Sequence, residues 1–265
     1  MAQLLIGLDD TDNADSRGTG YLARALLEEC GRRGLVVDAA SGRVPRKAAV
    51  GRFHVPGLGV TRHQFLVDPR IPYTSHNSGA CVAVEGADGA KAGDGAAAWA
   101  FAFDFVAGRS APGSDPGVCV ARAGDVPAEV IDFGRRASTE ILEAGEAIRL
   151  AKRAGLALRP LGGSGLGVIG ALASVGLRAG GGDGRFIDLP GLRELPARVG
   201  AEELVRLGIR LDHRGTRRCG PGDAYDTLGW VRPRLIGGGP VLPVEWSEEN
   251  HAWVPVDRRH NQQAR

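Results

Sequence analysis

The residues best suited to chemistry form a carboxylate cluster near the amino terminus, made of Asp9, Asp10 and Asp12. Clustered carboxylates raise one another's pKa unless a cation lies among them, so they favour a divalent metal. A second group, which could bind a phosphate, consists of Gly18, Thr19 and Gly20. An apolar-periodic stretch begins there, and a helix N-terminus attracts phosphate through its free N–H groups. Carboxylates for a metal and amides for a phosphate together indicate Mg²⁺–nucleotide chemistry.

Hydrophobic periodicity predicts the elements that position this cluster. Residues 4–8 form a short apolar run typical of a buried strand, and residues 21–33 carry apolar side chains at helical spacing. A strand that ends in polar residues before a helix is where α/β folds place ligands. The alternative is structural: aspartate and glycine are common in loops, and Thr19 would then be only the N-cap of the helix.

The rest of the chain alternates strand and helix patterns, which predicts a mixed α/β fold. Strands are expected at 35–39, 63–67, 81–85, 117–121 and 186–189, with further β segments near 225–230, 240–246 and 252–256. Helices are expected at 94–108, at 127–154 with a break near Gly145, and at 202–207. The polar connection at 69–79 is of the kind that carries function.

Glycine dominates residues 162–170, which contain a GxGxxG pattern followed by Asp183 and Asp188. This pattern is compatible with a dinucleotide fingerprint, whose acid binds a ribose. However, residues 156–161 contain an arginine and a proline, which argues against the buried parallel strand that such a fingerprint follows. We favour a glycine-rich loop that enters a small-residue helix at 168–175 and allows close approach of a ligand or a sheet.

Composition narrows the class of protein. The 265 residues carry a formal net charge of only +2, so no overall field indicates binding to DNA or an anionic membrane. The four cysteines are widely spaced, which indicates neither a zinc site nor a disulfide framework. The sequence shows no signal-peptide pattern and no apolar run of the ~18 residues that span a bilayer. We therefore expect a cytoplasmic protein.

Four ordered segments resemble one known family, the archaeal tRNA agmatinylcytidine synthetases. The first is GLDDTD at 7–12 with GTGYLA at 18–23, similar to the family's GIDDTDS and CTTYLA. The others are PRIP at 69–72 with GA at 79–80, the glycine segment at 163–176, and GPVL at 239–242. Together these matches cover most of the chain.

The resemblance implies a kinase-like α/β domain at 1–122, a ferredoxin-like α+β domain at 123–259 and a frayed tail at 260–265. It implies that ATP and Mg²⁺ phosphorylate a carbonyl oxygen and that an agmatine-like amine displaces the phosphate. In this comparison Asp9, Asp10 and Asp12 hold metal and phosphate, and Thr19 is itself phosphorylated. The other implied nucleotide- and amine-binding residues are Thr11, Gly18, Gly20, Gly163, Gly165 and Gly167.

Departures from the family shape the expected substrate. The sequence has no zinc-ribbon cysteines and no counterpart of the OB-fold that helps hold tRNA. The family's second threonine is replaced by Gly20, and its basic loop by residues 74–78, which include His76. We therefore expect a Mg-ATP-dependent ligase that joins an amine to a small-molecule acceptor, with the amine held by Asp183, Asp188 or Asp226. The alternatives are a non-catalytic nucleotide- or ligand-binding module and a tRNA-modifying enzyme that acts with a separate RNA-binding subunit.

Overall fold

The computed structural model describes residues 3–35, 58–74, 76–85, 95–227 and 229–256. The strands of these residues are β1 (Gln3–Asp9), β2 (Gly59–Gln64), β3 (Ser78–Glu85), β4 (Gly117–Arg122), β5 (Ala157–Pro160), β6 (Arg185–Asp188), β7 (Arg198–Gly200), β8 (Arg210–Arg214), β9 (Ala224–Asp226), β10 (Arg234–Ile236), β11 (Gly239–Ser247) and β12 (Ala252–Pro255). The helices are α1 (Thr19–Arg32), α2 (Gly95–Ala107), α3 (Ala128–Ala137), α4 (Ala144–Arg153), α5 (Gly167–Gly180) and α6 (Ala201–Arg206), and a 3₁₀ turn, η1, covers Ala123–Asp125.

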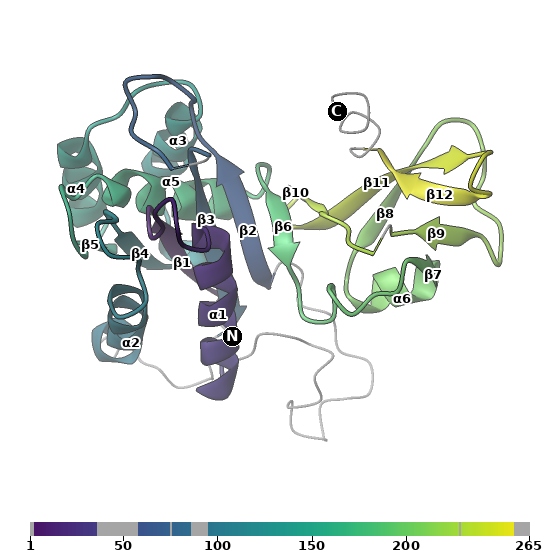
Figure 1. Cartoon of the computed structure of the whole chain (residues 1–265), viewed down its shortest axis with the longest axis horizontal. Coiled ribbons are helices and arrows are strands. Elements are labelled where there is room, and N and C mark those ends of the chain that lie inside the picture. Colours follow the sequence, from purple (N-terminus) through teal and green to yellow (C-terminus); the bar gives the residue numbers. More distant parts are fainter. Residues whose placement is uncertain (1–2, 36–57, 75, 86–94, 228, 257–265) are drawn as a thin grey trace.

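The strands form a sheet in the order β5-β4-β1-β3-β2-β6-β10-β11-β12-β9-β7, with β8 paired to β11. Figure 1 shows two halves, with the N-terminal strands and helices on one side and the strands from β7 onward, with α6, on the other. One residue pair, Arg234 with Arg185, joins β10 to β6 between them. Parallel pairing occurs between β11 and β8 and between β12 and β9, whereas the N-terminal strands pair antiparallel. The predicted mixed α/β class is confirmed.

The N-terminal sheet is covered on both faces, and β1 shows why. Because successive side chains of a strand point to opposite faces, Leu4, Ile6 and Leu8 join the core under α1 and α2. Leu5 joins the second core, which contains α3, α4 and α5. A third core lies in the C-terminal half, around Trp253. The near-continuous apolar run of β1 therefore reflects burial on both sides.

Helix α5 packs directly on this sheet because glycine removes the side chains that would separate them. A Cβ atom on Gly7 of β1 would overlap the carbonyl oxygen of Ala171 in α5. In the same way, a Cβ atom on Gly117 of β4 would overlap the backbone of Gly167 in α5, and a Cβ atom on Gly167 would overlap the backbone of Gly117. The prediction that the small-residue helix allows close approach to a sheet is thus confirmed.

Several element boundaries differ from the sequence expectations. The helical block at 127–154 breaks at residues 138–143, between α3 and α4, rather than near Gly145. The strand expected at 63–67 is the end of β2, which begins at Gly59. The segment at 156–161 contains the edge strand β5, where a proline is tolerated because one side of the strand has no ladder to donate to. The strand expected at 35–39 lies outside the described residues except for Leu35.

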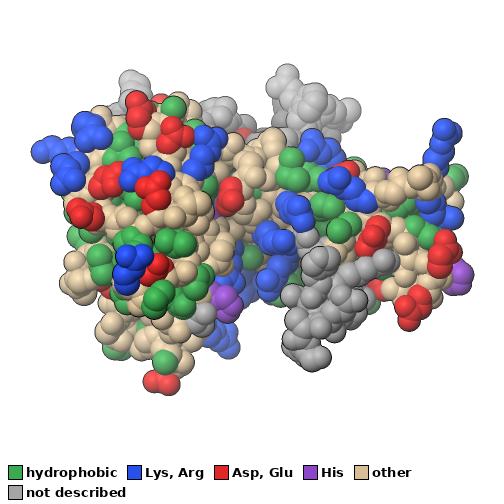
Figure 2. Space-filling view, turned by 90° about the horizontal axis from the view of Figure 1, so that it is seen from above, with side chains coloured by type: hydrophobic (Ala, Val, Ile, Leu, Met, Phe, Trp, Pro, Cys, Tyr) green, Lys and Arg blue, Asp and Glu red, His purple; other side chains and the backbone are tan. Residues whose placement is uncertain are grey.

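The elements that follow residue 122 continue the N-terminal body. Strand β5 pairs with β4, and α3, α4 and α5 share a core with β1 and β3. The division of the chain near residue 122 stays a prediction. Over the N-terminal half, at the left of Figure 2, acidic and basic side chains are interspersed, in keeping with the small net charge. None of the described helices is long and apolar enough to cross a membrane.

Candidate active site

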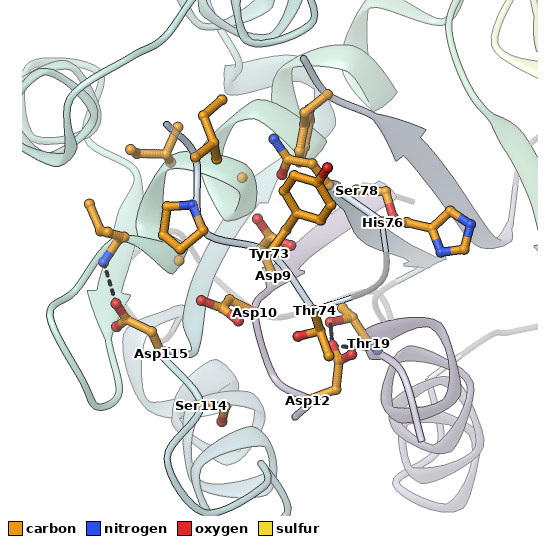
Figure 3. A pocket seen from close by; sticks show the side chains of 18 of the residues that line it. Asp9, Asp10, Asp12, Thr19, Tyr73, Thr74, His76, Ser78, Ser114 and Asp115 are labelled. Atoms are coloured by element: carbon orange, nitrogen blue, oxygen red, sulfur yellow. Dashed lines mark hydrogen bonds between the residues drawn. The ribbon is translucent and has the colours of Figure 1, made fainter. Parts of the chain in front are cut away.

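A cavity of about 710 Å³ opens at the end of β1, and the first residues of α1 and α5, Thr19 and Gly167, both line it. Its described lining includes the three predicted aspartates, Thr19 and Asp115. Figure 3 shows Asp9 and Asp10 between Asp115 on one side and the Asp12–Thr19 pair on the other. The sequence prediction that a buried strand delivers carboxylates to a helix N-terminus therefore describes the observed geometry.

Asp9 is the last residue of β1, and its carboxylate lies against the backbone of α5. A Cβ atom on Gly170 would overlap Asp9 Oδ2, so glycine at this position makes room for the acid. Burial, together with the nearby charges of Asp10 and Asp12, raises the pKa of Asp9 to about 7. Asp9 thus lines the cavity, but its burial at the end of β1 makes its negative charge unfavourable.

Asp10 has a left-handed backbone conformation, with φ of 51°. This conformation is uncommon outside glycine, although aspartate tolerates it better than most residues. Burial raises the pKa of Asp10 to about 6, and the charges of Asp115 and Asp12 add to the increase. Two adjacent carboxylates with raised pKa values indicate a site that would be stabilised by a cation.

Thr19 is the first residue of α1 and is 7% exposed, yet it lines the cavity. Its backbone N–H and its Oγ1 both donate to Asp12 Oδ1, at 3.1 and 2.8 Å. The Thr19 Oγ1 in turn accepts hydrogen bonds from the backbone N–H and the Oγ1 of Thr11, at 3.3 and 3.2 Å. Gly18 is the N-cap residue of α1. Thr19 is therefore the first residue of the helix and not its N-cap, and its role in phosphoryl transfer stays a prediction.

Asp115 is a fourth aspartate in the cavity lining. It accepts hydrogen bonds from Ser164 Oγ and from the backbone N–H groups of Gly165 and Leu166. Burial opposes its ionisation, but these hydrogen bonds outweigh that effect, and the net pKa of Asp115 is below its ordinary value. The glycine-rich loop at the start of α5 is thus closed around a carboxylate of the protein itself.

Much of the remaining lining of the cavity is apolar. These apolar residues include Phe65, Ile71, Pro72, Tyr73, Ile141, Leu142, Leu166 and Ile169. Several of these residues come from the polar connection at 69–79, which was predicted to carry function. Arg70 is the only arginine or lysine among the described lining residues, and both its Nε and its Nη2 donate to Asp68 at 2.8 Å. The cavity therefore combines an acidic side with an apolar side and little positive charge.

The donor chemistry of the acidic side fits a magnesium ion that is shared with a nucleotide. In the described part of the chain, no group of three or more His, Cys, Asp or Glu side chains is arranged to hold a metal by itself. Asp12 is hydrogen-bonded to Thr19, which leaves Asp9 and Asp10 as the adjacent carboxylates available to a metal. Mg²⁺ characteristically takes one or two carboxylates and fills its remaining positions with phosphate oxygens and water.

The other predicted residues divide into two sets. Gly163 and Gly167 line the cavity, and the N–H of Gly165 is bonded to Asp115. Thr11 supports Thr19 from behind, and the Cβ position of Gly20 faces Ile187, so these residues support α1 and do not line the cavity. Asp183, Asp188 and Asp226 are absent from the described lining: Asp183 lies 3.5 Å from His63, Asp188 lies 3.8 Å from Arg193, and Asp226 is in β9.

Sequence reasoning missed Asp115. It precedes β4, and its hydrogen-bond partners are 49 to 51 residues away along the chain. The only local signal was a carboxylate in the proline- and glycine-rich loop that ends at residue 116, and such loops are common. The pairing of this loop with the glycine-rich loop depends on the packing of α5 against β4.

The fold and the site together describe a mixed α/β protein with an acidic cavity at two helix N-termini. No family model matches the chain, and no curated protein does. The structure is similar to solved structures of TiaS, a tRNA agmatidine synthetase, with TM-scores of 0.48 for its complex with an isoleucine tRNA and ATP and 0.47 for the apo form, at 22% and 21% identity. A tRNA fluorescent labelling enzyme gives 0.45 at 23%.

Each of these matches covers 66% of this chain, but only 35–36% of the solved chain. The chain therefore spans about a third of the length of the structures it resembles. The synthetase named by these structures is the one that the sequence motifs resemble. At this level of identity the likeness concerns the fold.

Proposed function

We propose that this protein is a Mg-ATP-dependent enzyme that activates a carbonyl or amide oxygen by phosphorylation and ligates an amine to the activated carbon. The observation that carries the proposal is the meeting of Asp9 and Asp10 with the Asp12–Thr19 pair in one cavity. Phosphoryl transfer requires carboxylates that can bind a metal cation. It also requires a nucleophile, here a hydroxyl that is hydrogen-bonded to a carboxylate able to accept its proton.

Thr19 is the proposed phosphoryl acceptor within the protein. Its hydroxyl hydrogen already points to Asp12 Oδ1, at an Oγ1–Oδ1 distance of 2.8 Å. As Oγ1 attacks the γ-phosphorus of ATP, Asp12 Oδ1 takes the proton and ADP leaves with the electrons of the broken P–O bond. The phosphoryl group would then pass to the acceptor oxygen as the Thr19 Oγ1–P bond breaks, and Asp12 would return the proton to Oγ1. The amine would attack the activated carbon, inorganic phosphate would leave with the electrons of the C–O bond, and the proton of the amine would pass to water.

Asp9 and Asp10 would hold the magnesium ion, which would supply charge neutralisation for the triphosphate. The other carboxylates of the cavity lining, Asp115 and Glu140, favour a cationic amine over an anionic co-substrate. The apolar wall that includes Ile141 and Leu142 suits the uncharged part of a substrate. We therefore assign the agmatine-like amine to the carboxylates of this cavity. Asp183, Asp188 and Asp226 are not proposed to hold it, since none of these three is in the described lining.

The acceptor is the part of the proposal that needs a direct comparison. The departures of the sequence from the family favour a small molecule, whereas the similar solved structures are named for tRNA. The purified chain should be incubated with [γ-³²P]ATP, Mg²⁺ and agmatine, first alone and then with isoleucine tRNA or with a panel of small cyclic amides. We expect label on Thr19 without acceptor, and loss of that label with phosphate release when the correct acceptor is present.

A second function, a non-catalytic nucleotide-binding module, is favoured by one observation. The only described lining arginine is tied to Asp68, so the cavity offers little positive charge to a transition state that carries phosphate charge. Nucleotide binding measured by calorimetry, without label on Thr19 and without phosphate release under any of the conditions above, would replace the enzymatic proposal by this one.

A further inference from the structure

The N-terminus of α5 carries an anion that belongs to the protein. Asp115 Oδ1 accepts a hydrogen bond from the N–H of Gly165 at 2.7 Å, and Oδ2 accepts one from the N–H of Leu166 at 3.0 Å. Ser164 Oγ donates to the same Oδ2. These are the donors that a phosphate would use if it bound at the start of this helix.

The glycine-rich loop is shaped around this carboxylate. Gly163 has φ of +60°, and a Cβ atom there would lie 2.7 Å from Asp115 Oδ1. Gly167 would place a Cβ atom on the carbonyl oxygen of Asp115. Glycine at both positions is therefore explained by the need to wrap the loop closely around Asp115, and no bound phosphate is needed to explain it.

The two helix N-termini at the cavity differ in how they are occupied. At α1, Asp12 accepts hydrogen bonds from the backbone N–H and the hydroxyl of a single residue, Thr19, which also lines the cavity. At α5, Asp115 takes two backbone N–H groups and a hydroxyl. A triphosphate that approached α5 would meet a carboxylate held in place by three donors, with like charge.

We propose that Asp115 is a positioning residue that occupies the anion site of the glycine-rich loop and thereby directs the phosphate chain of a bound nucleotide to the N-terminus of α1. Leu166 and Ile169, which extend the apolar wall beside this loop, then face the less charged part of the ligands. This inference rests on the proposed function for the identity of the nucleotide. The occupation of the loop by Asp115 can be tested without it.

The test uses the full chain, labelled with ¹⁵N, and inorganic phosphate as the probe. In Asp115→Ala the donors of the loop lose their partner, and we expect phosphate to shift the amide resonances of Gly165 and Leu166 with at least ten-fold higher affinity than in the wild type. Asp115→Asn keeps a side chain in the loop and should show no such gain. Asp125→Ala, which removes an exposed acid outside the cavity, is the matched control.

A second measurement needs no variant. In the wild type, Mg-ATP should shift the amide resonances of Thr19 and Gly20 more than those of Gly165 and Leu166. The inference is overturned if Mg-ATP displaces Asp115 and shifts the loop amides most, or if a folded Asp115→Ala protein gains no phosphate binding at the loop. Failure of the proposed function has a different signature, the absence of nucleotide binding or transfer, and leaves the phosphate result for Asp115→Ala unaffected.

Discussion

Asp12 Oδ1 accepts hydrogen bonds from both the backbone N–H and the Oγ1 of Thr19, seven residues further along the chain. One carboxylate atom thus satisfies a free donor at the start of α1 and fixes the rotamer of the hydroxyl that lines the cavity. Thr11 donates to the other side of the same hydroxyl. The arrangement orients Thr19 Oγ1 before any ligand binds, and this preorganisation is what the first prediction tests.

Thr19→Val removes the hydroxyl and keeps the shape of the side chain. We expect label transfer from [γ-³²P]ATP to fall at least a hundred-fold, while the Kd for Mg-ATP changes only a few-fold. Thr19→Ser should retain label, now on serine, when tryptic peptides are examined by mass spectrometry. Thr139→Val is the matched control because Thr139 is an exposed threonine outside the cavity. Unchanged labelling in Thr19→Val would rule out Thr19 as the phosphoryl acceptor.

Asp9→Asn should stabilise the protein in the absence of divalent ions, and by an amount that depends on pH. The pKa of Asp9 is about 7 in the folded protein against 3.8 ordinarily. Below pH 4 the carboxyl is protonated in both states. Between pH 4 and 7 the unfolded chain releases its proton first, so the wild type loses stability as pH rises, by up to about 4 kcal/mol at about 1.4 kcal/mol per pKa unit.

The free energy of unfolding of Asp9→Asn should therefore exceed that of the wild type by a margin that grows from pH 4 to pH 7 and then levels off. Urea titrations in EDTA at several pH values measure this margin. Added Mg²⁺ with a nucleotide should raise the melting temperature of the wild type and leave that of Asp9→Asn nearly unchanged. A margin that does not vary with pH would show that Asp9 is not a costly buried carboxylate.

Gly170→Ala should disturb the site through Asp9. The added Cβ atom would overlap Asp9 Oδ2, so the carboxylate must rotate away from α5. We expect a loss of stability of ~1–3 kcal/mol from overpacking and a loss of the Mg²⁺-dependent increase in melting temperature. Gly182→Ala is the matched control, because a Cβ atom there would have no atom of the described residues within 4 Å. Equal behaviour of the two variants would contradict the close packing of Asp9 against α5.

Arg178→Met should raise the stability or leave it unchanged, although it removes a charged residue from α5. Arg178 is 4% exposed, and its Nη1 and Nη2 atoms have no hydrogen-bond partner in the described part of the protein. Its guanidinium lies over the ring of Phe186 at 4.8 Å, and burial lowers its pKa to about 10. Replacing an unpaired buried charge by an apolar side chain of similar length typically costs little or stabilises.

Thermal unfolding of Arg178→Met and Arg178→Ala would separate charge from packing. The alanine variant leaves a cavity and should lower the melting temperature, whereas the methionine variant should not. A fall of several degrees in the methionine variant would mean that the guanidinium makes a favourable polar interaction within the fold.

The sequence by itself determined the local part of the site. Strand β1, helix α1 and the carboxylates between them are adjacent in the chain, so periodicity and spacing were sufficient to place Asp9, Asp10, Asp12 and Thr19 together. The sequence also predicted that the helix after the glycine-rich loop packs closely against its neighbours, because glycine residues lack the Cβ atoms that would keep two backbones apart. These features depend on interactions over a few residues, which a pattern can record.

Tertiary structure alone decided the rest. Asp115 meets the glycine-rich loop across some 50 residues, and only the pairing of β4 with β5 and the packing of α5 on β4 bring the two loops together. The folded chain also leaves Asp183, Asp188 and Asp226 outside the described cavity lining, which their positions in the sequence did not reveal. A carboxylate that accepts hydrogen bonds from a backbone some 50 residues away produces no pattern in its own segment of the sequence. Its partners can therefore be identified only from the folded structure.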